Sequence, residues 1–68
     1  MSSPLLTPRQ KECLELFRDG LAYKQIAAYL GISLQTVKVH FDNIKNRLEA
    51  THKAHALVKA IKQGEITL

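Results

Sequence analysis

The stretch YKQIAAYLGISLQTVKVHFDNIKNRL, at residues 23–48, decides the fold. It holds two amphipathic helical patterns that meet at Gly31-Ile32-Ser33. Gly31 suits the left-handed conformation that follows a helix, and Ser33 is a good N-cap for the helix that starts after it. A short turn with glycine at its start joins two helices at a steep angle, and the apolar Ile32 is expected to fill the corner. The stretch therefore predicts a helix-turn-helix.

The helix after the turn is predicted over residues 34–49. Its apolar residues recur at helical spacing and form one narrow stripe, made of Val37, Phe41, Ile44 and Leu48. The rest of its surface carries mostly polar side chains. This helix is therefore expected to pack on the core along one line.

Two helices are predicted before the turn. The first covers residues 8–18, where Thr7 can cap the helix, Pro8 suits its first position and Gln10 completes a capping box. The second covers residues 23–30, although the residue before it, an alanine, cannot cap it with a side chain.

A fourth helix is predicted over residues 52–63, with Thr51 as a candidate cap and Gly64 as its stop. Its apolar side chains cover roughly 200° of arc, whereas a surface helix of a small bundle needs little more than about 100°. The core is expected to take Leu57, Ala60 and Ile61. The additional apolar surface indicates either that a partner covers it or that the helix is buried more deeply than a surface helix. The residues assigned to a dimer interface are Ala54, His55, Val58 and Ile61.

These elements predict an all-α fold, a compact four-helix bundle with a central helix-turn-helix. The domain is expected to cover residues 6–68, after a flexible leader at residues 1–5. That leader suits either a link from an upstream domain or the start of a small stand-alone regulator.

The chain is short and basic. A domain of 68 residues buries only about 60% of the surface of its unfolded chain, which leaves no room for an ordinary enzyme cleft. The net charge of +4 and the pI of about 9.5 favour a polyanionic partner, usually nucleic acid, although they also serve solubility. No phosphate loop or nucleophile motif is present in the sequence. We expect no enzyme, no cofactor and no small-molecule ligand.

The single cysteine, Cys13, rules out an internal disulfide and favours a reducing compartment such as the cytoplasm. It lies on the apolar face of the first helix, so a buried, inert thiol is expected. A zinc site built from Cys13 with His40, His52 and His55 is not expected, since no Cys-x-x-Cys pair exists. His40 is interpreted as a structural histidine. The sequence shows neither a signal peptide nor an apolar run long enough to span a membrane.

The polar face of the helix at residues 34–49 has the chemistry to read base edges. Lys38 can donate to guanine, amide side chains can pair with adenine, Val39 can meet a thymine methyl group and Asp42 can accept from cytosine. The alternative is a solvated face. The apolar Val39 and the many amides favour DNA. The predicted base-reading residues are Gln35, Lys38, Val39, Asp42, Asn43 and Asn46.

Contacts with phosphate groups are predicted for Lys24, Thr36 and Lys45. Lys24 and Thr36 lie near the starts of the helices at residues 23–30 and 34–49, and Lys45 lies further along the second of these helices. In the alternative interpretation Lys24 is an ordinary surface residue and Thr36 only supports the Ser33 cap.

The pattern LTPRQ…G…K.IA..L.IS..TVKVH..NI, within residues 5–66, resembles the LuxR-type helix-turn-helix domain, also called the GerE or FixJ/NarL type. The resemblance implies four helices, a third helix that reads the major groove, and pairing through the fourth helix on a two-fold site. It also implies the C-terminal output domain of a quorum-sensing receptor or response regulator, or a small stand-alone regulator. The contact positions that it carries over are Lys24, Thr36, Lys38, Val39, Asp42 and Asn43.

The chain departs from the family's usual residues at several positions. The family usually has Ser-Asn at Ala22-Tyr23, Gly-Val at Glu49-Ala50 and Arg at Lys53. Ala22 lacks a hydroxyl that could reach phosphate, and the hydroxyl of Tyr23 is a candidate replacement.

The sequence as a whole is interpreted as a sequence-specific binder of double-stranded DNA, a bacterial transcription regulator that acts as a homodimer on DNA and can contact RNA polymerase. The main alternative is an interaction module of the same fold that binds RNA polymerase or another regulator. A purely structural or dimerisation domain would have no use for the amide-rich helix.

Overall fold

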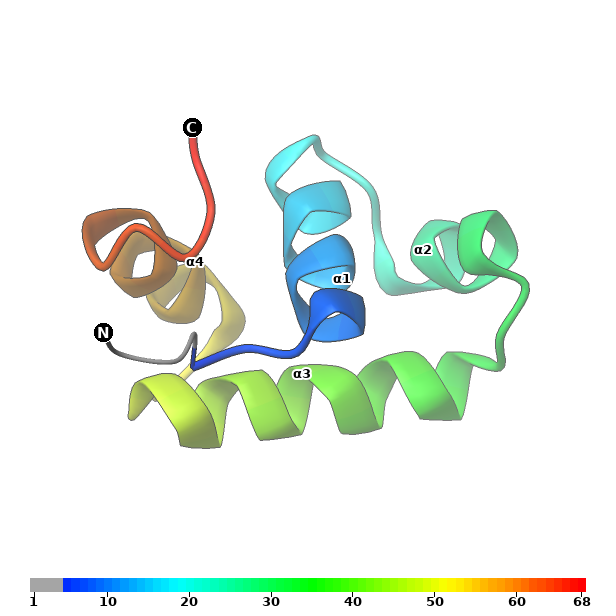
Figure 1. Cartoon of the computed structure of the whole chain (residues 1–68). Helices are drawn as coiled ribbons and strands as arrows, with labels where there is room; N and C mark the ends of the chain where they lie inside the picture. The colour runs from blue at the N-terminus through cyan, green and yellow to red at the C-terminus, as the bar shows by residue number, and fades with distance from the viewer. Residues whose placement is uncertain (1–4) are drawn as a thin grey trace.

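A computed structural model describes residues 5–68 and contains four helices within that range. The helices are α1 (Pro8–Arg18), α2 (Tyr23–Leu30), α3 (Leu34–Leu48) and α4 (Lys53–Lys62). In Figure 1, α3 runs along one side of the molecule and the other three helices lie across the opposite side. The all-α four-helix prediction is confirmed. Residues 1–4 of the expected leader lie outside the described residues, and Leu5 is exposed.

Local hydrogen bonds explain where the first two helices begin. The Thr7 hydroxyl accepts from the Gln10 N–H at 3.2 Å, and the Gln10 amide oxygen accepts from the Thr7 N–H at 3.0 Å. This confirms the predicted capping box. At the start of α2 only half of such a box exists, because Gln25 accepts from the Ala22 N–H at 2.8 Å while Ala22 offers no acceptor.

The turn between α2 and α3 has the predicted form. Gly31 ends α2 in the left-handed region with φ 68°, where glycine carries no Cβ penalty. Ser33 caps α3, because its hydroxyl accepts from the Thr36 N–H at 3.0 Å. Ile32 is partly buried against the core, as expected for the residue at the corner.

Three predicted boundaries differ from the observed ones by one residue each. Helix α3 ends at Leu48 because Glu49 adopts φ 54° and ψ 44°, which is left-handed and not helical. Helix α4 starts at Lys53, and its cap is His52 instead of Thr51: the His52 Nδ1 accepts from the His55 N–H at 3.2 Å. Helix α4 ends at Lys62, because Gln63 is its C-cap and not its last helical residue. A histidine is a rare cap, so composition alone pointed to the threonine.

The core lies between α3 and the other helices. All four residues of the predicted α3 stripe are buried, at no more than 2% exposure. They meet Cys13 and Leu14 of α1 and Ile26 of α2. The remaining core residues are Leu6, Ala27, Ala56, Ala60 and Ile66.

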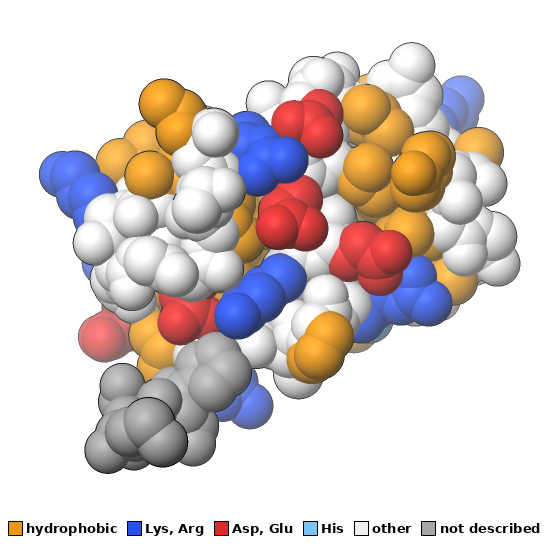
Figure 2. All heavy atoms as spheres, turned by 45° about the horizontal axis from the view of Figure 1, so that its top comes forward, with side chains coloured by type: hydrophobic (Ala, Val, Ile, Leu, Met, Phe, Trp, Pro, Cys, Tyr) orange, Lys and Arg blue, Asp and Glu red, His pale blue; other side chains and the backbone are white. Residues whose placement is uncertain are grey.

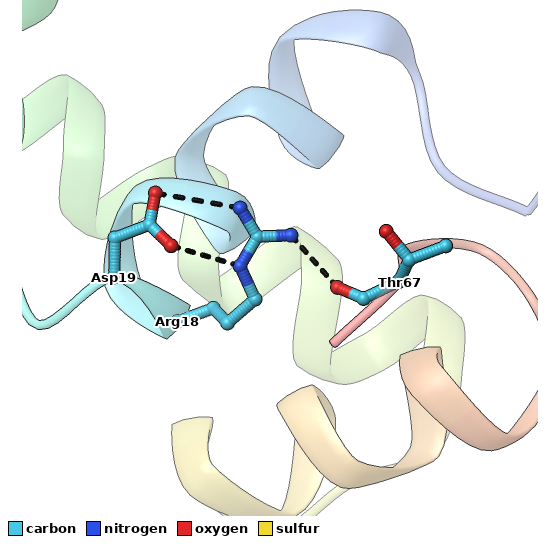
Figure 3. A network of polar contacts seen from close by, with 3 residues as sticks. All are labelled: Arg18, Asp19 and Thr67. Carbon is cyan, nitrogen blue, oxygen red and sulfur yellow. Dashed lines mark hydrogen bonds and ion pairs between the residues drawn. The ribbon is translucent and has the colours of Figure 1, made fainter.

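The two ends of the described chain are fastened to this bundle. The Leu6 N–H donates to the Glu65 carboxylate at 2.9 Å. At the end of α1, Arg18 holds Asp19 and donates to the Thr67 carbonyl oxygen at 2.7 Å (Figure 3). The hydrogen bond from Arg18 to the Asp19 carboxylate lowers the pKa of that carboxyl group. None of the helices in residues 5–68 is long and apolar enough to cross a membrane.

Candidate nucleic-acid interface

The outer face of α3 carries the predicted base-reading residues. All six side chains are exposed: Gln35, Lys38, Val39, Asp42, Asn43 and Asn46. They lie on the side of the helix turned away from the buried stripe, since about 100° separates successive residues. Val39 is 46% exposed although it is apolar. The face thus combines one apolar contact with donors and acceptors on a single rigid helix.

Charge is distributed unevenly around this face. Lys38 and Lys45 fall on the flank that also carries Asp42, and the Lys45 ammonium lies 3.5 Å from the Asp42 carboxylate. Arg47 falls on the opposite flank and donates to the Leu5 carbonyl oxygen at 3.5 Å. Helix α3 thus has three basic residues and one acidic residue. A pair that solvent reaches at both residues has a small effect on stability.

The side of the molecule away from α3 is different. Figure 2 brings that side forward and shows acidic and basic side chains interspersed there. Three of the six acidic residues, Glu12, Glu15 and Asp19, lie on α1 or directly after it. This mixed surface is less suited to a polyanion than the flanks of α3.

The three predicted phosphate contacts differ in their surroundings. Lys24 is exposed near the start of α2 and has no ion-pair partner among residues 5–68. Lys45 is half-buried beside Asp42. The Thr36 hydroxyl lies 2.8 Å from the Ser33 hydroxyl, so Thr36 does support the cap, yet the residue is exposed.

The predicted interface residues on α4 are only partly free. Ala54 and Val58 are exposed, whereas His55 and Ile61 are half-buried. The His55 Nδ1 accepts from the Thr51 N–H at 3.4 Å. Of the residues expected in the core, Ala60 is buried, while Leu57 and Ile61 pack against the core with part of their surface exposed. Ala56, which the periodicity left unassigned, is fully buried.

Cys13 and His40 lie outside the set of predicted contact residues. Burial raises the pKa of the Cys13 thiol, and the expected buried position of Cys13 is confirmed. His40 is half-buried at the edge of the stripe. No three His, Cys, Asp or Glu side chains within residues 5–68 are placed to hold a metal ion.

Sequence reasoning missed an aromatic cluster beside α3. Tyr23 of α2 stacks on Phe41 at 4.6 Å between ring centres, and Phe17 of α1 meets Phe41 edge-on at 5.8 Å. The Lys53 ammonium of α4 lies over the Tyr23 ring at 4.3 Å from its centre. The departures at Tyr23 and Lys53 are visible in the sequence, but only the fold brings these residues together.

Comparison with known proteins identifies the fold and the family. The family model described as "Bacterial regulatory proteins, luxR family" matches residues 4–60. The spore germination protein GerE of Bacillus subtilis is 37% identical over 98% of this chain and 90% of its own length. A solved structure of the transcription factor GerE superposes with a TM-score of 0.91 at 29% identity, covering 96% of this chain and 97% of that one.

Other relatives are longer proteins. The transcriptional activator CarR of Pectobacterium carotovorum is 41% identical over 85% of this chain but only 24% of its own length. The transcriptional activator LuxR of Aliivibrio fischeri is 37% identical over 96% of this chain and 26% of its own length. The chain thus spans about a quarter of these two relatives and nine-tenths of GerE. With its helix-turn-helix fold and these similarities, this chain belongs to the luxR family of bacterial regulatory proteins.

Proposed function

We propose that this chain binds double-stranded DNA sequence-specifically, as the DNA-reading domain of a bacterial transcription regulator in the cytoplasm. The observation that carries the proposal is the outer face of α3, whose side chains are all free of the core. A major groove about 12 Å wide admits one α-helix. Membership of a family of regulatory proteins points in the same direction.

The residues proposed to read bases are Gln35, Lys38, Val39, Asp42, Asn43 and Asn46. Lys38 donates to the O6 and N7 atoms of guanine, and the amides pair with adenine. Val39 packs on a thymine methyl group, and Asp42 accepts from the N4 amino group of cytosine. The Asp42 side chain is 69% exposed and can be reached from the groove, which supports this assignment.

Phosphate groups are proposed to be held by Lys24, Thr36 and Lys45. Lys24 has no carboxylate to compete with a phosphate among the described residues. These contacts fix the register of the domain on the duplex but carry no sequence information.

On a two-fold symmetric site we propose a homodimer formed through α4, with Ala54, His55, Val58 and Ile61 at the interface. The exposed apolar Val58 supports this choice. The two half-sites are then expected about one helical turn of DNA apart, roughly 34–36 Å. Contact with RNA polymerase is proposed for surfaces that DNA and the second copy leave free.

The test is selection from a random duplex pool, followed by affinity measurements over a salt series. The proposal expects binding that weakens steeply with salt and an enriched two-fold symmetric site. Steep salt dependence without enrichment would reduce the function to nonspecific binding. No binding at low salt would overturn the proposal and favour the interaction module.

A variant pair sharpens this test. Lys38→Ala is expected to cost about 1–3 kcal/mol on the selected site and much less on random duplex. Lys62→Ala removes an exposed lysine at the far end of α4 and serves as the control. Equal losses on both kinds of DNA would make Lys38 a phosphate contact instead.

A further inference from the structure

Lys53 and Tyr23 form a side-chain pair that links the beginnings of two helices. Lys53 is the first residue of α4 and Tyr23 the first of α2. The Lys53 ammonium lies 4.3 Å from the centre of the Tyr23 ring and 5.3 Å from that of Phe17. Aromatic faces attract cations at such distances. Tyr23 is itself held by stacking on Phe41 of α3. The cation is therefore positioned by packing and not by a carboxylate.

Both polar groups of the pair lack a protein partner. Within residues 5–68, the Lys53 ammonium forms no ion pair and the Tyr23 hydroxyl forms no hydrogen bond with another described residue. Tyr23 is half-buried, yet no buried side-chain oxygen or nitrogen in this part of the chain is left without a partner. The Tyr23 hydroxyl therefore reaches solvent. A positive charge and a neutral donor are thus both available to an acceptor.

The pair lies beside the proposed DNA-reading face. Tyr23 packs on Phe41 of the buried stripe, and Lys45, one helical turn further along α3, lies on the same side of that helix. Burial raises the pKa of Tyr23, and the Asp42 carboxylate raises it further. This agrees with a Tyr23 hydroxyl on the Asp42 flank of α3. Lys24 follows Tyr23 directly, and Lys45 occupies the same flank. A helix in the major groove has the sugar-phosphate backbone along its flanks.

We propose that Lys53 and Tyr23 together bind one phosphate group of the DNA backbone beside α3. The Lys53 ammonium supplies the charge and the Tyr23 hydroxyl donates a hydrogen bond to a phosphate oxygen. The contact rests on the proposed function and extends it from α2 and α3 to α4. It fastens the first turn of α4 to the DNA that α3 reads.

The experiment compares Lys53→Gln, Lys53→Arg and Tyr23→Phe with the unchanged chain on the same duplex over a salt series. Removing one cation–phosphate contact makes the slope of log affinity against log salt shallower by about 0.9. We expect this for Lys53→Gln, with recovery of the slope in Lys53→Arg. Tyr23→Phe keeps the ring and loses a neutral hydrogen bond, so it weakens binding about two- to tenfold with an unchanged slope.

The matched control is Lys62→Gln, which removes a lysine from the last turn of the same helix. Lys62→Gln is expected to keep the slope, and thermal unfolding checks that each variant is folded. In the double variant Tyr23→Phe with Lys53→Gln, the losses are expected to be less than additive because both act on one phosphate.

Two results would overturn the assignment. If the unchanged chain binds with a steep salt dependence and Lys53→Gln has the same slope, the phosphate contact is wrong while the DNA-binding function stands. If Lys62→Gln loses as much slope as Lys53→Gln, the effect is one of net charge. Absence of any duplex binding by the unchanged chain would instead overturn the proposed function, and this contact with it.

Discussion

The Lys59 ammonium of α4 donates to the carbonyl oxygen of Glu49 at 3.1 Å, and to that of Leu48 at the same distance. These carbonyl groups lie at the C-terminal end of α3, where the last turn leaves acceptors without helical partners. The partial negative charge of a helix C-terminus also favours a cation. One side chain thus ties the fourth helix to the end of the third.

We predict that Lys59→Met lowers the free energy of unfolding by about 1 kcal/mol, because methionine keeps the apolar stem and loses both charge-assisted hydrogen bonds. Urea unfolding followed by circular dichroism measures the change. The exposed Lys62→Met is the matched control and is expected to be neutral. Equal changes in the two variants would show that the contact contributes nothing.

Glu49 leads to a prediction of the opposite sign. Its φ of 54° places a residue with a Cβ in the left-handed region, at a cost of roughly 1–2 kcal/mol that glycine avoids. We predict that Glu49→Gly raises the free energy of unfolding by about 1 kcal/mol. Glu49→Ala keeps the strain and is expected to be no more stable than the unchanged chain. If alanine stabilises as much as glycine, the backbone conformation is not the cause.

Alkaline pH is predicted to destabilise the domain through Cys13. Burial raises the pKa of this thiol above its ordinary value of 9.0. The unfolded chain therefore releases the proton at a lower pH than the folded chain. The stabilising effect is complete below pH 9.0 and is lost as the pH rises toward the folded pKa. Urea unfolding in a pH series checks this, and Cys13→Ala is expected to remove most of the added slope.

Tyr23 contributes to the same decline at higher pH, because its pKa is also raised, from an ordinary value of 10.0. Tyr23→Phe separates the two contributions. The decisive range lies immediately above pH 9.0. If the free energy of unfolding falls equally steeply there in Cys13→Ala and in the unchanged chain, the thiol is not responsible.

Val58 offers a test of the proposed pairing through α4. The residue is 48% exposed, so Val58→Asp is expected to leave the fold intact. Burying an unpaired charge in the interface costs free energy, and a cost of about 1.4 kcal/mol already weakens binding about tenfold. We therefore expect binding to a full two-fold site to weaken by about tenfold or more. Binding to a single half-site is expected to stay unchanged. Equal weakening on both sites would place Val58 outside the interface.

The sequence predicted most of the fold because the helix signals in this chain are local. The capping box of Thr7 and Gln10, the left-handed Gly31 and the Ser33 cap are each read within a few residues, and each has the predicted geometry. The end of α3 was harder, since Glu49 gives no local sign of a left-handed conformation. Local bonds close this end, because the Ala50 N–H donates to the Lys45 carbonyl oxygen at 2.8 Å and the Glu49 N–H donates to that of Asn46 at 3.3 Å. The Lys59 ammonium adds a tertiary contact to the Glu49 carbonyl oxygen.

The candidate site divides in the same way. Helical periodicity is sufficient to place Gln35 and Asn46 on the outer face of α3, because one helix determines their positions. It could not predict that Lys53 lies over Tyr23, since 30 residues separate them and four aromatic or basic side chains from all four helices have to meet. Contacts of this kind depend on packing, which a pattern of residue types does not contain.

The bond from the Leu6 N–H to Glu65 joins residues 59 positions apart, and Leu6 and Ile66 are both buried. The segments before α1 and after α4 therefore pack on the core and on each other, and neither segment can detach without exposing core surface. Unfolding is expected to be cooperative, with no early fraying from either side. The Leu6 amide should then exchange its hydrogen with solvent as slowly as the amides at the centre of α3.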